Sequence, residues 1–182
     1  MSIEYNHPEA LLARARRIAL LCLDVDGTLT DGSIDFDEDG RESKRFHVHD
    51  GLGIALLRRH GIDVAFVTAR HSPVAERRAA ELGAEAHTRI KDKRACVQEM
   101  LARRGLAAGQ VAFMGDDLVD LPALALAGLA AAPANCHPWL HDRVHFTSTR
   151  PGGHGAVREL CDLLLLAQGH ANAALEGFGG AQ

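Results

Sequence analysis

Two carboxylates stand where a run of apolar residues ends. Asp24 and Asp26 lie in the stretch I-A-L-L-C-L-D-V-D-G-T-L-T, whose first part, residues 18–25, is predicted to be a buried strand. Two negative charges at the end of such a strand oppose burial and repel each other. Their chemistry can offset that cost, because one carboxylate can attack phosphorus and form an aspartyl-phosphate. The second can protonate the leaving oxygen and then take a proton from the hydrolytic water.

Further polar residues follow at later strand ends. Thr68 follows the apolar run 62–67, Lys93 stands at the start of a predicted helix, and G-D-D-L-V-D follows the run 111–114. Each of these residues, like a lone D-x-D, is by itself more often a capping, strand or solvated surface residue. Ligands of parallel sheets bind outside the carboxyl ends of the strands, so the ordered set favours a functional site at that edge.

A site with several carboxylates needs a cation, since mutual repulsion would otherwise keep some of them protonated. Besides Asp24 and Asp26, the acidic run contributes Asp116, Asp117 and Asp120. Hard oxygen ligands without histidine or cysteine suit Mg²⁺, which commonly bridges to a phosphate. A lysine and a threonine hydroxyl suit phosphate oxygens. The sequence therefore predicts a magnesium-dependent phosphoryl-transfer site.

The elements that position these residues predict an α/β fold, with a Rossmann-like parallel sheet and helices on both of its faces. The predicted strands are 18–25, 62–67, 84–87, 111–114, 129–132 and 144–146, and the predicted helices are 8–17, 52–59, 72–82, 92–104, 119–127, 137–141 and 155–167. Two short alternating runs, 33–36 and 43–48, predict a small β-hairpin inserted after the first strand. His47 and His49 would face one way on its second run.

The fold is predicted to be capless. Only 41 residues separate Asp26 from Thr68 and only 24 separate Thr68 from Lys93, too few for an independent cap of roughly 50 residues or more. The hairpin could enclose a small substrate if it docks on a neighbouring subunit. We expect one domain over residues 1–168 and a glycine-rich tail over 169–182, which either frays or reaches another subunit's site.

Composition excludes some partners. The 182-residue chain has a net charge of −4, which gives no basic field for nucleic acid or an anionic membrane. No apolar run approaches the ~20 residues that span a bilayer, and the polar, acidic N-terminus is unlike a signal peptide. The four cysteines form no C-x-x-C pair and suit the core of a protein in a reducing compartment. We therefore expect a cytoplasmic protein.

The motifs D-V-D-G-T-L-T, T-A-R, a lysine and G-D-D-L-x-D resemble those of the haloacid dehalogenase superfamily of aspartyl-phosphate hydrolases. The resemblance implies that Asp24 is the nucleophile and Asp26 the acid/base. It implies that Thr68 and Lys93 hold the phosphoryl group. The implied magnesium ligands are Asp24, the main-chain carbonyl of Asp26, and Asp116, with Asp117 in support.

A closer resemblance covers nearly the whole chain. F-H-V-H-D-G-L-G-I, G-D-D-L-V-D-L-P and G-G-H-G-A-V-R-E-L-C-D-L-L-L-L-A-Q-G look like segments of the 3-deoxy-D-manno-octulosonate 8-phosphate phosphatases. Members of that family are tetramers that dephosphorylate a sugar acid used in lipopolysaccharide synthesis. By similarity, the substrate site would contain Asp26, His47, Val48, His49, Asp50, Gly51, Arg70, Arg78 and Lys93. The family often has arginine where this chain has His49, Ala55 and His154, and a lost arginine removes a partner for a substrate anion.

Three alternatives stay open at this stage. Within enzymes, the substrate could be the phosphate of a related nine-carbon sugar acid, or a phosphorylated protein or nucleic acid. The non-enzyme alternative is a receiver-like phospho-switch, which also uses Asp, Mg²⁺, Thr and Lys on a parallel sheet. In such a switch the phosphorylated Asp ends a later strand, so the order of motifs favours the hydrolase.

Overall fold

A parallel sheet forms the centre of the molecule. The computed structural model describes residues 7–179, and in it six strands run in the order β5-β4-β1-β6-β7-β8, each parallel to its neighbours. The strands are β1 Leu20–Leu23, β4 Asp63–Val67, β5 Glu85–His87, β6 Val111–Met114, β7 Leu129–Ala132 and β8 Phe146–Thr147. The predicted Rossmann-like sheet is confirmed, and β6 and β7 have the bounds that the sequence predicted.

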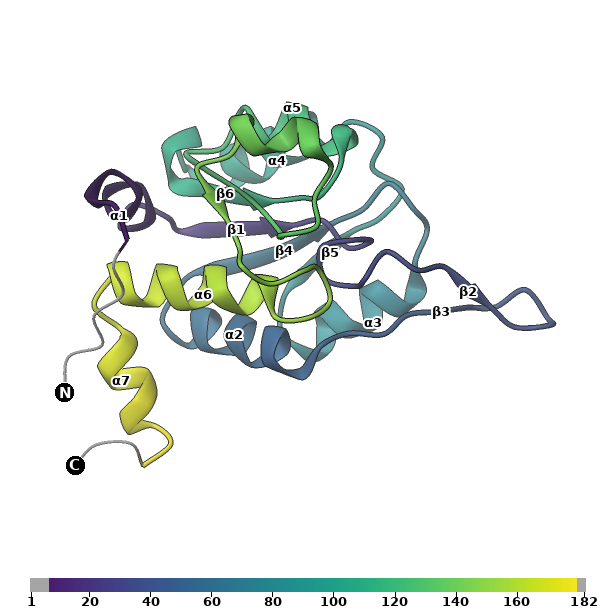
Figure 1. Ribbon diagram of the computed structural model, residues 1–182, viewed down its shortest axis with the longest axis horizontal. Helices are drawn as coiled ribbons and strands as arrows, with labels where there is room; N and C mark the ends of the chain where they lie inside the picture. Colours follow the sequence, from purple (N-terminus) through teal and green to yellow (C-terminus); the bar gives the residue numbers. More distant parts are fainter. Residues whose placement is uncertain (1–6, 180–182) are drawn as a thin grey trace.

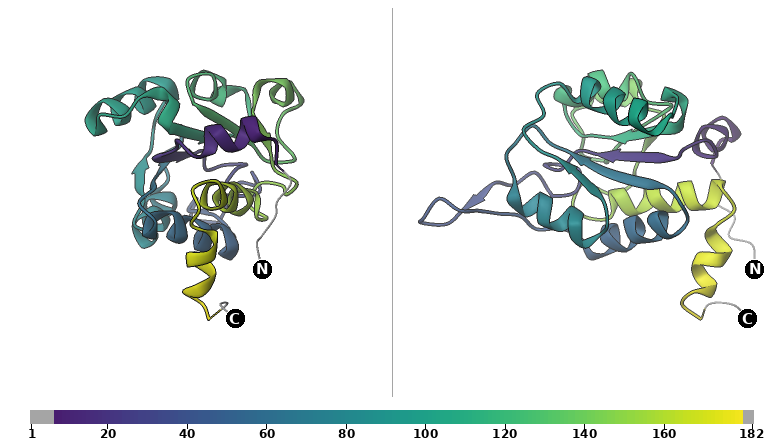
Figure 2. Two further views of the ribbon diagram at one scale, coloured as in Figure 1. Left: turned by 90° about the vertical axis from the view of Figure 1, so that its left-hand side faces the viewer. Right: turned by 180° about the vertical axis from the view of Figure 1, so that it is seen from behind.

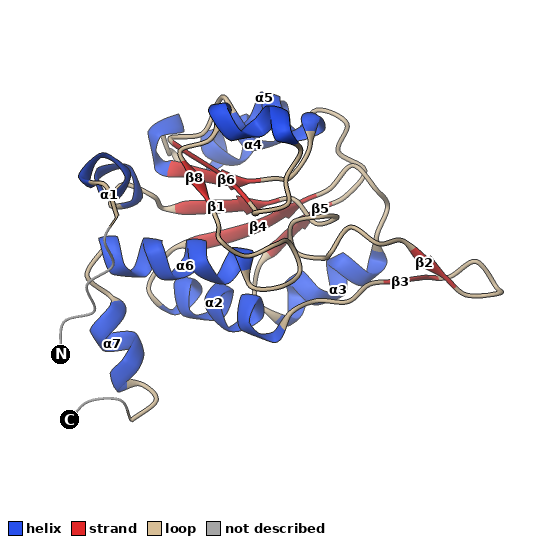
Figure 3. Cartoon of the chain, in the orientation of Figure 1, coloured by secondary structure: helices blue, strands red, loops and turns tan. Residues whose placement is uncertain are grey.

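Helices cover both faces of this sheet, as Figures 1 and 3 show. They are α1 Glu9–Ala15, α2 Val48–Arg59, α3 Pro73–Glu81, α4 Lys93–Arg104, α5 Leu121–Leu124, α6 Ala156–Ala167 and α7 Ala171–Glu176, with the 3-10 turns η1 Ala108–Gln110, η2 Leu118–Asp120 and η3 Pro138–Arg143. Strand alternation sends Leu21 and Leu23 of β1 into one core with α2 and α6. Leu20 and Cys22 enter the other core, with α4. Strand β1 is therefore buried on both faces.

Helix caps place two site-bearing loops. The side chain of Ser72 caps α3 by accepting a hydrogen bond from the Ala75 N–H at 3.3 Å. Asp92 caps α4 in the same way through the Ala95 N–H at 2.9 Å, so Lys93 is the first residue of that helix. Gly105 ends α4 in the left-handed conformation at φ 64°.

The inserted hairpin is real but shorter than its sequence pattern. Strands β2, Asp35–Phe36, and β3, Glu42–Ser43, pair antiparallel, and the hairpin extends away from the body of the molecule (Figures 1 and 2). The prediction that His47 and His49 share a strand is wrong, because α2 begins at Val48 and His47 is its N-cap. Phe46 and Val48 fit the alternating apolar pattern of a strand, but their side chains do not share a buried face. Phe46 packs against the core, whereas Val48 is 72% exposed.

Further elements differ from the sequence prediction, among them the predicted helix 137–141, which is the 3-10 turn η3. The predicted helix 119–127 is a 3-10 turn, η2, followed by the four-residue α5, which has a proline in its first turn. Within the predicted tail 169–182, residues 171–176 form α7, and residues 180–182 lie outside the described part of the chain. Among residues 7–179 no helix is both long and apolar enough to cross a membrane.

Candidate active site

The loop after β1 lies in close contact with two other segments, the loop after β6 and the segment before α6. Asp24 continues the sheet, with its N–H donating to the Met114 carbonyl of β6 at 2.9 Å. Gly27 has φ +96°, and a side chain there would strike the Asp116 carboxylate. A side chain at Gly152 would strike the Gly27 carbonyl oxygen. The glycines therefore allow the acidic run and the segment before α6 to approach the two candidate carboxylates closely.

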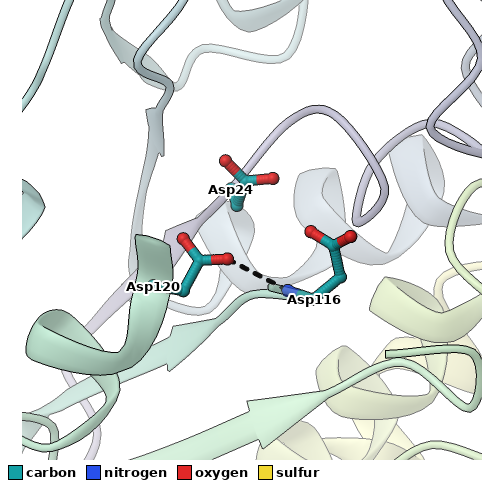
Figure 4. Close-up of side chains that lie close together, drawn as sticks. All are labelled: Asp24, Asp116 and Asp120. Atoms are coloured by element: carbon teal, nitrogen blue, oxygen red, sulfur yellow. Dashed lines mark hydrogen bonds between the residues drawn. The ribbon is translucent and has the colours of Figure 1, made fainter. Parts of the chain in front are cut away.

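Lys93 gathers the carboxylates at the carboxyl edge of the sheet. Its ammonium donates to Asp24, and to Asp120 at 2.6 Å, and all three side chains are almost completely buried. The other oxygen of Asp120 accepts the backbone N–H of Asp116 at 3.1 Å, drawn as the dashed line in Figure 4. Carboxylate oxygens of Asp24, Asp116 and Asp120 all lie within 4.8 Å of one another. We call Asp24, Lys93, Asp116 and Asp120 the core cluster.

The electrostatics of the core cluster favour binding of a cation. Burial, with Asp120 adding repulsion, raises the pKa of Asp24 well above its ordinary value. Burial, Asp120 and Asp117 together raise the pKa of Asp116 to about 6. Burial alone would lower the pKa of Lys93, but Asp24 and Asp120 outweigh it and the pKa is raised. One ammonium among three carboxylates leaves excess negative charge, and oxygen ligands at this spacing fit a hard divalent cation.

A second cluster forms beside the first and brings in residues that the sequence analysis did not predict. The ammonium of Lys44 contacts a carboxylate oxygen of Asp26 and lies 3.3 Å from Glu42. Glu42 also accepts from Arg70 at 2.6 Å. The Thr68 hydroxyl lies 3.4 Å from the other Asp26 oxygen. We call Asp26, Lys44, Glu42 and Arg70 the hairpin cluster, since two of its members flank the end of β3.

The structure thus brings together Asp24, Asp26, Thr68, Lys93 and Asp116, as the sequence predicted for one sheet edge. Asp117 lies differently: it is exposed and its side chain caps η2 through the Leu118 N–H at 2.7 Å. Asp120 occupies the buried position beside Asp116 instead. Its spacing of one helical turn from Asp116 was visible in G-D-D-L-V-D. No sequence signal marked Lys44 or Glu42.

The residues at the start of α2 divide into two groups. The imidazole ring of His47 lies 4.9 Å from that of His49 and 6.5 Å from that of His154, between centroids. Asp50 is buried and faces α6, where it accepts the Arg158 N–H at 2.8 Å, and burial raises its pKa. Val48 is largely exposed.

Arg78 of α3 lies next to the start of α2. Its guanidinium lies 5.9 Å from the centre of the Phe46 ring and pairs with Glu81 at 2.8 Å. A side chain at Gly51 would strike it, so the glycine permits this approach.

This fold and this acidic edge define a class, the haloacid dehalogenase-like hydrolases, whose family model matches residues 53–128. A phosphatase of Yersinia pestis, named for 3-deoxy-D-manno-octulosonate 8-phosphate, is 44% identical to the chain over 87% of it and 85% of the relative. The chain belongs to this phosphatase family. It is therefore a phosphoric monoester hydrolase, and the receiver-like alternative is excluded.

Solved structures agree with the assignment. A hypothetical protein of Xanthomonas campestris is 47% identical, with a TM-score of 0.95, over 98% of both chains. The phosphatase of Moraxella catarrhalis, solved with a magnesium ion, a phosphate ion and the sugar acid, is 36% identical, with a TM-score of 0.92. That similarity covers 94% of this chain and 99% of the other.

Proposed function

We propose that this protein hydrolyses 3-deoxy-D-manno-octulosonate 8-phosphate to the free sugar acid and phosphate, with Mg²⁺ as cofactor and an aspartyl-phosphate on Asp24. The observation that carries the proposal is the core cluster, in which Asp24 ends the central strand among two further carboxylates and a buried lysine. The relatives named for this substrate, and the Moraxella structure with magnesium and the sugar acid, support the same reaction.

Residues of the core cluster, together with the main chain of Asp26, would hold the cation. Asp24 and Asp116 supply carboxylates and Asp26 its main-chain carbonyl, and Asp120 lies closer to them than Asp117. The cation supplies positive charge that offsets the carboxylates and the phosphate oxygens. We propose that Lys93 and the Thr68 hydroxyl then hold the phosphoryl group.

The chemistry needs only two carboxylates from the chain. A carboxylate oxygen of Asp24 attacks phosphorus while the bond from phosphorus to the sugar oxygen breaks, and Asp26 gives that oxygen a proton. Asp26 then takes a proton from water as the water oxygen attacks phosphorus. The bond from phosphorus to Asp24 breaks, which releases phosphate, returns Asp24 to a carboxylate and leaves Asp26 protonated, as it was before the first step.

The sugar acid would contact the start of α2 and the two arginines. We propose that residues 47–51, Arg70 and Arg78 form this part of the site, with buried Asp50 anchoring the start of α2 to α6 and not facing the sugar. Three imidazoles, those of His47, His49 and His154, lie close together there and can donate hydrogen bonds to a carboxylate. Because the last two replace arginines that are frequent in the family, a nine-carbon sugar acid phosphate is the second candidate.

The hairpin suggests how an open site becomes enclosed. Ile34 and Phe36 near β2 are 50% and 61% exposed, on a hairpin that projects from the body of the molecule (Figure 2). We propose one hydrolase domain over 1–168, a tail over 169–182, and a cytoplasmic homotetramer in which the hairpin, and the tail with it, lie at a neighbouring site. Light scattering at four times the chain mass supports this assembly, and a monomer mass contradicts it.

A substrate panel tests the proposed function. Purified protein with Mg²⁺ is assayed for phosphate release from eight- and nine-carbon sugar acid phosphates, simple sugar phosphates, a phosphopeptide and a nucleotide. We expect the highest kcat/KM for the eight-carbon sugar acid 8-phosphate, and loss of activity with a chelator that Mg²⁺ restores. Higher kcat/KM for another substrate would overturn the substrate, and full activity in chelator would overturn the cofactor.

A further inference from the structure

Lys44 is a lysine of the hairpin whose charged end is buried. Its side chain is 1% exposed, although the hairpin itself projects from the body of the molecule. The ammonium lies between the carboxylates of Asp26 and Glu42, which are 18% and 12% exposed. Burial of an ammonium is costly unless ion pairs and hydrogen bonds compensate it, so these two contacts account for its position.

The same contact fixes the carboxylate of Asp26. Lys44 donates to Oδ1 of Asp26, and the Thr68 hydroxyl lies 3.4 Å from Oδ2. Asp26 stands in the loop after β1, outside any helix or strand. Lys44 of the hairpin thus contacts one oxygen of the Asp26 carboxylate, and Thr68, directly after β4, lies near the other. Contacts at both oxygens restrict the rotation of this short side chain.

Glu42 extends the contact into a row of alternating charges. It lies 3.3 Å from Lys44 and accepts from Arg70 at 2.6 Å, so the row runs Asp26, Lys44, Glu42, Arg70. The row joins the loop after β1, the second hairpin strand and the loop after β4. The hairpin is therefore tied to the site through the side chain assigned to proton transfer.

We propose that Lys44 is a positioning residue that orients the carboxyl group of Asp26, which carries a proton for this step, toward the leaving oxygen, an inference that rests on the proposed function. The need for a general acid rises with the basicity of the leaving group. A sugar alkoxide is a strong base and needs the proton, whereas 4-nitrophenolate leaves without it. Loss of positioning should thus affect alkyl phosphates selectively, while loss of mere structural support should affect both substrates.

The experiment compares kcat/KM for a primary sugar phosphate and for 4-nitrophenyl phosphate with Mg²⁺, since kcat/KM reports the step in which the leaving group departs. The variants are Lys44→Met, which keeps the length but removes the charge, and Lys44→Arg, which keeps the charge. Lys91→Met removes an exposed lysine as the matched control. Thermal unfolding and light scattering establish that each variant is folded and has the same assembly.

We expect Lys44→Met to lower kcat/KM about 100-fold for the sugar phosphate and less than about 10-fold for 4-nitrophenyl phosphate. Lys44→Arg should restore part of the wild-type ratio of kcat/KM for the sugar phosphate to kcat/KM for 4-nitrophenyl phosphate. Lys91→Met should have the wild-type ratio. Equal losses for both substrates, or no loss, would overturn the proposal. If Lys44→Met does not fold, Glu42→Gln takes its place. A fall of about 3-fold in the ratio of kcat/KM for the sugar phosphate to that for 4-nitrophenyl phosphate then supports the proposal, and an unchanged ratio overturns it.

Failure of this inference differs from failure of the proposed function. If Asp24→Asn keeps wild-type turnover, the nucleophile is wrong and the proposed reaction fails. If Asp24→Asn is inactive and Lys44→Met keeps the wild-type substrate ratio, only the role of Lys44 is wrong.

Discussion

Lys93 and Lys44 each lie between two carboxylates, yet different parts of the fold support them. Lys93 begins α4, and its partners, Asp24 and Asp120, are fixed by the central strand and by the turn after β6. Lys44 follows a two-residue strand of a projecting hairpin, and its partners reach solvent in part. The core cluster is thus built into the sheet, whereas the hairpin cluster depends on where a long insertion docks. Substitutions at Lys44 should therefore affect the proton carrier, Asp26, without disturbing the nucleophile, Asp24, which the sheet supports.

The largest expected effect comes from the nucleophile of the core cluster. Asp24→Asn should lower kcat at least about 10⁴-fold, because the amide cannot form the aspartyl-phosphate. The same change removes a buried charge beside Asp120, so the unfolding temperature without divalent cations should equal or exceed that of wild type. Steady-state kinetics and thermal unfolding measure both. A variant with wild-type kcat would remove Asp24 from the reaction.

The two lysines should differ in stability. Lys93→Met leaves two almost completely buried carboxylates without their ammonium and should lower the free energy of unfolding by about 3–5 kcal/mol. Lys44→Met should cost about 1–2 kcal/mol, since Asp26 and Glu42 keep access to water. Urea unfolding in chelator measures both variants. Equal losses would show that the hairpin cluster is as much a part of the core as the sheet edge.

Magnesium should stabilise the protein in a pH-dependent way through the core cluster. The pKa of Asp116 is raised from 3.8 to about 6, so between these values the folded protein binds more protons than the unfolded chain. Metal-free stability should therefore fall as pH rises through that window. Mg²⁺ needs the ionised carboxylate, so it should stabilise more at pH 7 than at pH 5.

Thermal unfolding with chelator and with Mg²⁺ tests this. At about 100 times its Kd, Mg²⁺ should add about 2.7 kcal/mol, or roughly 5–10 °C, at pH 7. Asp116→Asn should reduce the shift and weaken its pH dependence, of which Asp24, whose pKa is also raised, should keep a part. A shift that is the same at both pH values in wild type would contradict the assignment of Asp116.

The smallest expected effect is at the tip of the hairpin. Arg41 is 75% exposed and pairs with Asp39 at 2.7 Å. Arg41→Ala should change the free energy of unfolding by less than about 0.5 kcal/mol, because exposed pairs contribute little. It should also leave the ratio of alkyl to aryl turnover unchanged. A fall in that ratio, measured beside Lys44→Met, would extend the positioning role to the whole hairpin.

Much of the core cluster could be predicted from the sequence. Apolar runs that alternate with helical patterns predict a parallel sheet, and the carboxyl ends of parallel strands meet at one edge. The positions of Asp24 and Asp116, and that of Thr68 outside the cluster, were therefore predicted from local pattern alone. Lys93 followed from the predicted helix 92–104, and the structure shows that Asp92 is the cap of that helix.

The hairpin cluster could not be predicted in this way. Residues 43–48 alternate like a strand, yet the chain turns into α2 at Val48, because local alternation does not reveal which side chains meet the core. Lys44 is a lysine in a polar hairpin, and the sequence alone predicts that such a residue is exposed to solvent. Its burial depends on Asp26 and Glu42, which approach only when the hairpin lies against the loop after β1.

The sequence by itself determined the sheet, its acidic edge and the class of reaction, since these follow from periodicity and from the chemistry of carboxylates at strand ends. Only the tertiary structure decided which aspartate accompanies Asp116, where α2 begins and which lysine contacts Asp26. These three features depend on contacts between segments that are far apart in the chain. A charged side chain is buried between such segments only where the fold brings an opposite charge beside it.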